Sequence, residues 1–128
     1  MFKDDVKSGK ANNNDLIAYV EDWHKYDYNM SLRKFLGCNE EEYVLFLRND
    51  FMTDKIIDGW RSGVNYHPTY TVFFDDLCER VCESYSTVQK TVNEIIAEGH
   101  KNVTPVAYDG TINKTWADIK RNELWKAK

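Results

Sequence analysis

Hydrophobic residues between Phe74 and Ile95 recur at alternating intervals of four and three positions. The repeating residues are Phe74, Cys78, Val81, Tyr85, Val88, Val92 and Ile95. Such a heptad-like spacing places one apolar stripe along a helix. The pattern therefore predicts a long amphipathic helix over about 75–98, ended by Gly99. Two interpretations remain open: the helix forms the centre of the core, or residues 74–95 form the seam of a homodimer.

Polar caps and glycine stops in the N-terminal half predict four shorter helices, over residues 16–24, 31–36, 40–49 and 54–61. Ser31 is a suitable N-cap for the second helix, and Gly37 ends it. Asn39 caps the third helix, in which Glu42 completes a capping box. Thr53 caps the fourth helix. Ahead of them, residues 1–13 are mostly polar and predict a flexible arm or a loosely docked leader.

β-structure is predicted in two places, over residues 64–74 and in a hairpin over 103–116. The first is rich in β-branched and aromatic residues, and the second contains the turn dipeptide Asp109-Gly110. Pro105 confines its strand to a sheet edge, and Thr115 caps a last helix over 116–128. The expected fold is mainly α, with α+β left open. It is a helical domain around the long helix with a small β element, and 1–128 form a single domain.

The composition fits one soluble globular domain, since 42% of the 128 residues are apolar and 14% aromatic. No apolar run is long enough for a membrane helix, and the N-terminus lacks the apolar core of a signal peptide. We therefore expect a cytoplasmic protein. The three cysteines, Cys38, Cys78 and Cys82, form no even set for disulfides, so we expect them to pack as small apolar residues.

The net charge of −4 is unevenly distributed. Residues 1–100 carry 11 basic and 18 acidic side chains, a net of −7, whereas 101–128 carry 6 and 3, a net of +3. The basic patch of the C-terminal segment comprises Lys114, Lys120, Arg121, Lys126 and Lys128. Trp116 and Trp125 lie among these residues. Three interpretations stay open: a helix that docks through its tryptophans, a contact with an acidic protein, or a nucleic-acid contact.

The stretch Ser31–Asp50 has the layout of a helix-turn-helix, with a short helix, a glycine turn and a second helix. Its second helix opens with Glu40, Glu41 and Glu42, and residues 39–50 have a net charge of −3. Carboxylates repel the phosphates that a DNA-reading helix must approach. A helix-turn-helix transcriptional regulator therefore remains the alternative prediction, and not the leading one.

Catalytic and metal-binding patterns are weak. Glu21 and His24 form half of a di-iron motif that lacks its second half. Cys78 and Cys82 would share a helix face, but zinc needs four ligands. There is no serine-nucleophile elbow, no glycine-rich phosphate loop and no local Cys–His signature. The sequence thus predicts a protein that is not an enzyme, with no cofactor and no metal site.

The segment WHKYDYNMSLRKFLGCNEEEYVLFLRN, residues 23–49, resembles a segment of small, largely uncharacterised proteins of bacteria, phages and prophages. The shared pattern is S-L-x-x-F-L-G followed by E-E-Y in the next helix. The resemblance implies a phage or mobile-element setting in a bacterial host cell. Small acidic proteins there often act as inhibitors or antitoxins by occupying a partner's surface. The chain is similar to anti-CRISPR proteins in size and charge only.

These observations predict a non-enzymatic binding protein that inhibits or regulates a macromolecular partner by protein–protein contact. The partner is expected to be a protein, and a nucleic-acid-binding protein suits the acidic residues, which resemble phosphates in charge. The expected partner-binding residues are Glu40, Glu41, Glu42, Asp75, Asp76, Tyr26, Tyr28, Tyr66 and Tyr70. The tyrosines are included because tyrosine is frequent at interface hot spots; as core or strand residues they would be hidden instead.

Overall fold

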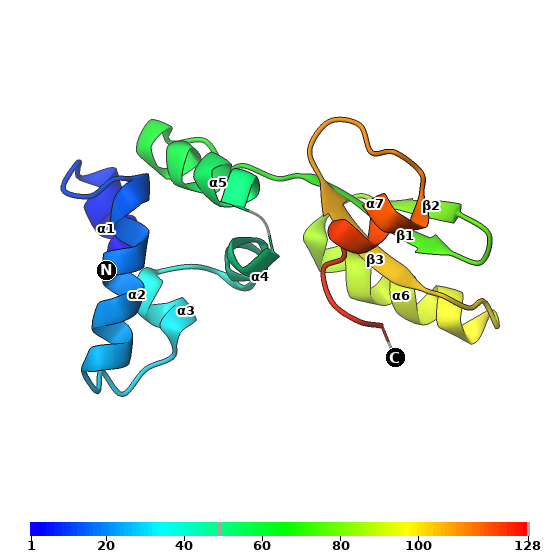
Figure 1. Ribbon diagram of the computed structural model, residues 1–128, viewed down its shortest axis with the longest axis horizontal. Coiled ribbons are helices and arrows are strands. Elements are labelled where there is room, and N and C mark those ends of the chain that lie inside the picture. Colours follow the sequence, from blue (N-terminus) through cyan, green and yellow to red (C-terminus); the bar gives the residue numbers. More distant parts are fainter. Residues whose placement is uncertain (49, 128) are drawn as a thin grey trace. The chain divides into compact units, whose positions relative to one another are not determined.

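The computed structural model describes residues 1–48 and 50–127 and shows an α+β protein, about 52% helical with one small antiparallel sheet (Figure 1). The chain divides into two compact units, Met1–Tyr66 and His67–Lys128. The expected single domain stays a prediction, because two compact units can still unfold together. Two predicted positions, Asn49 at the end of the third helix and Lys128 in the basic patch, lie outside the described residues.

The N-terminal unit is helical. Its elements are α1 (Phe2–Lys7), a 3₁₀ turn (Asn13–Asp15), α2 (Leu16–Lys25), α3 (Leu32–Leu36), α4 (Glu40–Arg48) and α5 (Asp50–Ser62). The buried side chains that join these helices are Phe2, Val6, Leu36, Leu45, Met52, Ile56, Ile57 and Trp60. The unit therefore has a core of its own, made of residues within Met1–Tyr66.

Helix α1 occupies the segment for which the sequence predicts an arm. Phe2 and Val6 are fully buried, and the Phe2 ring lies 5.0 Å from that of Tyr19 and 5.9 Å from that of Trp60. Tyr19 also donates a hydrogen bond from its hydroxyl to Asp5, which raises the pKa of Tyr19 to about 12. Two apolar residues four positions apart are a weak signal, so the burial of this helix depends on tertiary contacts that the local pattern does not reveal.

The predicted caps are confirmed for α3 and α4 and wrong for α5. The Ser31 hydroxyl accepts a hydrogen bond from the Lys34 amide at 3.3 Å, and Gly37 ends α3 with a φ of 83°. Asn39 and Glu42 form the reciprocal capping box, with distances of 2.8 and 2.9 Å. Thr53 lies buried within α5, which begins three residues earlier.

The C-terminal unit combines a three-stranded sheet with two helices. Its elements are β1 (Thr69–Phe74), β2 (Cys78–Cys82), a 3₁₀ turn (Tyr85–Thr87), α6 (Val88–Ala97), β3 (Thr104–Tyr108) and α7 (Trp116–Arg121). The strand order is β2-β1-β3, and both pairings are antiparallel. Both faces of the central strand are covered: Phe73 packs with Val106 and Ile119 of α7, while α6 contacts β1 through a buried face of its own.

The long helix predicted over 75–98 is wrong. Asp75 and Leu77 have φ values of 50° and 64°, which no α-helix accommodates, and they form the turn between β1 and β2. The first part of the stripe belongs to strand β2, where Val81 is 64% exposed. Only α6 retains the helical pattern, so residues 74–95 offer no continuous helical seam for the expected homodimer.

The other β predictions are confirmed in part. Residues 64–74 contain β1, and Pro105 lies in β3, an edge strand as predicted. The hairpin over 103–116 is wrong, because β3 pairs with β1 and residues 111–116 form no strand. Thr115 caps the last helix, accepting from the Asp118 amide at 3.2 Å, but α7 is shorter than predicted.

A short backbone segment covers the outer edge of β3. The Ala107 amide donates to the Asn122 carbonyl at 3.1 Å, and the Leu124 amide donates to the Pro105 carbonyl at 2.8 Å. Between them, Val106 and Glu123 form an isolated antiparallel bridge. Residues 122–124 are thereby fixed along the sheet, and they determine where the segment that follows them lies. None of the described helices combines the length and the apolar character that crossing a bilayer requires.

Candidate functional site

A group of exposed aromatic and apolar side chains of the N-terminal unit lies between α2 and α3. Tyr26 is 54% exposed, Tyr28 38% and Met30 42%. The Tyr26 and Tyr28 rings meet edge to face with centroids 6.1 Å apart, and Tyr28 lies 4.6 Å from Phe35 of α3. We call these four residues, with Trp23, the aromatic surface.

Local hydrogen bonds fix the loop that carries the aromatic surface. The Trp23 indole N–H donates to the Met30 carbonyl at 2.9 Å and so closes the loop onto α2. Asn29 has a φ of 52°, and its amide donates to the Asp27 carboxylate at 3.1 Å. These bonds restrain the backbone of the loop, and a restrained loop loses less entropy on binding.

Charged side chains of both signs flank the aromatic surface. Residues 21–30 contain three acidic residues and one lysine, a net of −2. Glu21, Asp22 and Asp27 are all exposed. The lysine, Lys25, lies with its ammonium 5.5 Å from the Tyr26 ring centroid. The α2 side of the surface is therefore acidic, whereas on the α3 side the exposed Lys34 lines a hollow together with Met30 and Lys3.

The other two predicted tyrosines do not join this surface. Tyr70 is only 2% exposed, because it lies in β1 and its ring packs on Tyr85 at 5.7 Å. Its expected role as an exposed anchor is wrong. Tyr66 is half-buried and lies at the last position of the N-terminal unit.

The predicted acidic residues fall into two groups with different surroundings. Glu40 is exposed and Glu41 half-buried, at the start of α4. Glu42 is a structural residue: besides its capping bond, its other carboxylate oxygen accepts the Trp60 indole N–H at 2.6 Å. It is therefore a poor candidate for partner contact.

Asp75 and Asp76 lie in the β1–β2 turn rather than at a helix start. Asp75 accepts from the Lys101 backbone N–H at 2.8 Å and lies 2.6 Å from Nδ1 of His100. The Lys101 amide first, and His100 second, lower the pKa of Asp75. Asp75 thus holds the loop after α6 against the turn, and only Asp76 of this pair is freely exposed.

A second ion pair lies next to His100. Arg80 of β2 makes two hydrogen bonds to Glu98, at 3.1 and 3.2 Å, and these lower the pKa of Glu98. The Glu98 carboxylate also lies 3.7 Å from Nε2 of His100. His100 is therefore flanked by carboxylates on both ring nitrogens. The two carboxylates orient the His100 ring, and both ring nitrogens are used in these contacts, of which the one with Asp75 holds the loop after α6 to the β1–β2 turn.

The predicted basic patch is divided by local ion pairs. Lys114 pairs with Glu79, and Arg121 with Asp118 at 2.7 Å. The Lys114 ammonium has a raised pKa because of its bond to Glu79. The remaining described lysines, Lys120 and Lys126, line a pocket.

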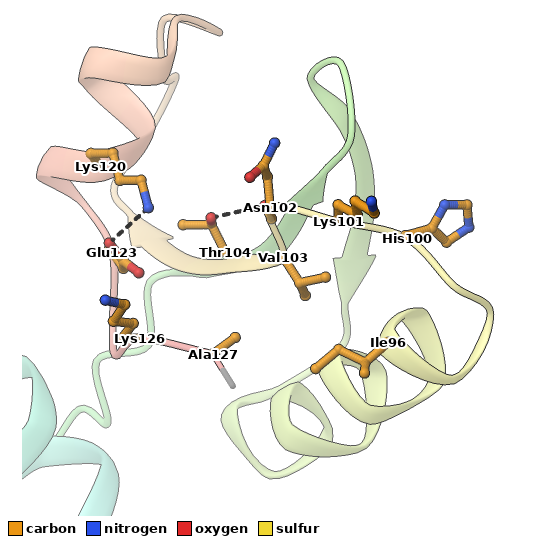
Figure 2. A pocket seen from close by; sticks show the side chains of 10 residues that line it. All are labelled: Ile96, His100, Lys101, Asn102, Val103, Thr104, Lys120, Glu123, Lys126 and Ala127. Carbon is orange, nitrogen blue, oxygen red and sulfur yellow. Dashed lines mark hydrogen bonds and ion pairs between the residues drawn. The ribbon is translucent and has the colours of Figure 1, made fainter.

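The pocket has a volume of about 410 Å³ and lies between the end of α6, residues 100–104 and the segment after α7. Figure 2 shows Ile96 and Val103 pointing into it, with Lys120 and Lys126 on one side and Lys101 on the other. Lys120 reaches Glu123 at 3.5 Å. The His100 ring is turned away from the centre (Figure 2).

Sequence reasoning missed Lys101 and Asn102 as members of this site. Both follow α6 in the chain, and β3 must pair with β1 before they face the segment after α7. Lys101 is the first residue of the basic segment 101–128, but the sequence did not indicate that it lies near Lys120 and Lys126.

The three cysteines do not come together among the described residues. Cys38 and Cys82 are buried, and burial raises the pKa of Cys38 to about 12 and that of Cys82 in the same direction. Cys78 is exposed on β2. Within residues 1–48 and 50–127, no three His, Cys, Asp or Glu side chains come together to hold a metal ion.

A scan of protein-family models and searches of curated proteins and of solved structures find no match for this chain. The candidate sites are therefore defined by their own geometry.

Proposed function

We propose that this chain is a non-enzymatic binding protein that inhibits or regulates a macromolecular partner by protein–protein contact. The observation that carries the proposal is the aromatic surface, in which exposed tyrosines lie in a loop that hydrogen bonds close onto α2. The phage or mobile-element setting of a bacterial host is part of the proposal and comes from the resemblance of residues 23–49.

Exposed apolar side chains are concentrated in the N-terminal unit. Eight of the ten large apolar side chains recorded as exposed lie in Met1–Tyr66, and only Val81 and Ile96 lie in the other unit. Single exposed apolar residues are ordinary, whereas a group of neighbouring aromatic rings is typical of interaction sites. Tyrosine adds large contact area with few rotatable bonds, which is why it is frequent at hot spots.

The acidic α2 side of the aromatic surface favours a basic partner. Acidic side chains there attract a positively charged surface over about a Debye length, roughly 8–10 Å, and discourage contact with nucleic acid. A protein whose own function is to bind nucleic acid presents such a surface. We therefore propose a nucleic-acid-binding protein as the partner class.

The helix-turn-helix alternative receives less support. Helix α3 has five residues, and the first turn of α4 carries Glu40 and Glu41 at the point where a reading helix would approach DNA. Repulsion between these carboxylates and phosphate opposes DNA contact by this helix.

The test is affinity purification with the full chain from a bacterial lysate, followed by an activity assay of the recovered protein. The wild type should recover a stoichiometric basic protein and inhibit it, and Tyr26→Ala/Tyr28→Ala should lose both effects. Phe51→Ala is the matched control, because Phe51 has the same 54% exposure as Tyr26. Recovery of no stoichiometric partner, or equal recovery by the double variant with native circular dichroism, would refute the proposal.

A further inference from the structure

A second hollow lies next to the basic pocket along α6. The second hollow has a volume of about 320 Å³ and shares Ile96, Lys126 and Ala127 with the first. Its other walls include Gln89 and Asn93 of α6 and Trp125. We call the two neighbouring hollows together the α6 groove.

Cationic side chains lie at separate points of the α6 groove. Lys101 is at one side of the first hollow, and Lys120 and Lys126 are at the other (Figure 2). No described residue forms an ion pair with Lys101 or Lys126, and Glu123 is the only carboxylate among the residues that line the two hollows. Among the described lining residues, lysines therefore outnumber carboxylates, although Asp75 and Glu98 lie against His100, which lines the first hollow. The C-terminal unit as a whole is weakly acidic.

The C-terminal end of α6 does not cancel this positive charge. The last carbonyl groups of a helix repel anions when they are unpaired. Here the carbonyls of Glu94, Ile95 and Ile96 accept hydrogen bonds from the amides of residues 98–100. The backbone next to the first hollow is therefore already satisfied.

The second hollow offers an aromatic ring and amides. Trp125 is half-buried, and its ring meets Tyr85 at 6.2 Å and 73°, which supports the indole from one side. The Gln89 amide donates to Asn93 at 2.9 Å. This bond leaves the Gln89 oxygen and the Asn93 amide N–H groups available at the groove wall. A planar, hydrogen-bonding group fits this end of the groove better than a simple anion does.

We propose that the α6 groove binds single-stranded nucleic acid. Lysines on opposite sides of the groove match successive phosphates of an extended strand better than they match a single phosphate. Trp125 supplies the stacking surface on which unpaired bases bind. In a duplex the base faces are occupied by neighbouring base pairs, so the indole has nothing to stack on. This inference is independent of the proposed docking by the aromatic surface, which lies in the other unit.

Fluorescence anisotropy of a labelled ten-nucleotide oligothymidine with the full chain tests the proposal. Contacts from three lysines predict a log–log salt slope of about −2 for a single strand. Affinity should then fall roughly fifteenfold between 50 and 200 mM salt. A salt-independent signal, or no binding at low salt, would overturn the proposal.

Charge-matched variants locate the binding. Lys101→Gln/Lys126→Gln should reduce affinity at least tenfold and bring the slope to about −0.7. Lys90→Gln/Lys114→Gln removes the same charge outside the groove, from lysines that pair with Glu94 and Glu79. That control should bind within about twofold of the wild type. Equal losses in the two variants would show general charge attraction and overturn the proposal.

Stacking and ligand class are tested separately. Trp125→Phe should retain most of the affinity and Trp125→Ala should lose about tenfold, with circular dichroism as the folding check. A duplex of the same length should bind at least tenfold more weakly than the single strand. Binding of polyglutamate in place of oligothymidine would overturn the proposal in favour of an acidic peptide, and equal binding of the duplex would overturn it as well.

Discussion

Glu42→Ala is the substitution that best separates a structural carboxylate from a partner-binding one. In the folded chain Glu42 accepts the Asn39 amide at 2.9 Å and the Trp60 indole N–H at 2.6 Å. Loss of half the capping box costs about 1 kcal/mol. Because Trp60 is only 5% exposed, its indole loses its partner away from water, at a cost of about 1–3 kcal/mol. We therefore expect the free energy of unfolding to fall by about 2–4 kcal/mol.

Urea unfolding followed by circular dichroism measures this loss. Glu40→Ala is the control, since Glu40 is exposed in the same first turn and its removal costs only the helix-dipole contribution of about 0.3–1 kcal/mol. Glu42→Gln should lie between the two, because an amide oxygen still accepts one hydrogen bond. If Glu42→Ala and Glu40→Ala agree within about 0.5 kcal/mol, the structural role assigned to Glu42 is wrong.

Three further predictions concern backbone space, pH and thiol chemistry. Gly59→Ala should lower stability by more than 1 kcal/mol in the same urea assay, because its Cβ would lie 2.3 Å from the Val64 carbonyl oxygen; a neutral result would contradict this packing. The pKa of Asp75 is lowered on folding, so its stabilisation is present above the unfolded pKa of about 3.9 and is lost as pH falls through the folded value. Asp75→Asn should flatten the stability profile in acid, and an unchanged profile would refute the assignment. Ellman's reagent should react quickly with Cys78 and not with Cys38, whose thiol is buried with a pKa of about 12; two fast thiols would contradict this.

Local signals predicted the N-terminal helices well. The caps at Ser31 and Asn39 and the stop at Gly37 involve residues within one turn of each other, so their physics is contained in the sequence. The same holds for Thr115. Helix α1 was not predicted, because Phe2 is stabilised by contacts with Tyr19 and Trp60, which lie seventeen and fifty-eight positions away in the sequence.

The long-helix prediction failed because a period of 3.5 does not exclude other structures. Positions such as Val81 and Tyr85 suit a strand or a turn as well as a helix. Two residues with positive φ, Asp75 and Leu77, break the stripe at its start. Neither is a glycine, and although aspartate tolerates a positive φ, the Asp75-Asp76 pair equally suits the first turn of a helix.

The candidate sites were predictable only in part. Tyr26 and Tyr28 lie in a polar stretch between helices, which is where exposed aromatics are expected. Tyr70 had the opposite signal, since it belongs to a run of β-formers that a central strand buries on both sides. The α6 groove could not be predicted, because its walls include Lys101 and Lys126, which are twenty-five positions apart in the sequence and come near each other only in the folded unit.

The pairing of residues 122–124 with β3 couples self-association to recognition. An uncovered edge strand offers its amides and carbonyls to any other extended chain. The segment that prevents this also leads directly into Trp125 and Lys126, so it sets one wall of the groove. A change that loosens the segment therefore opens the groove and exposes the strand edge at once. Substitutions that weaken ligand binding by loosening this segment should therefore also cause the chain to form oligomers.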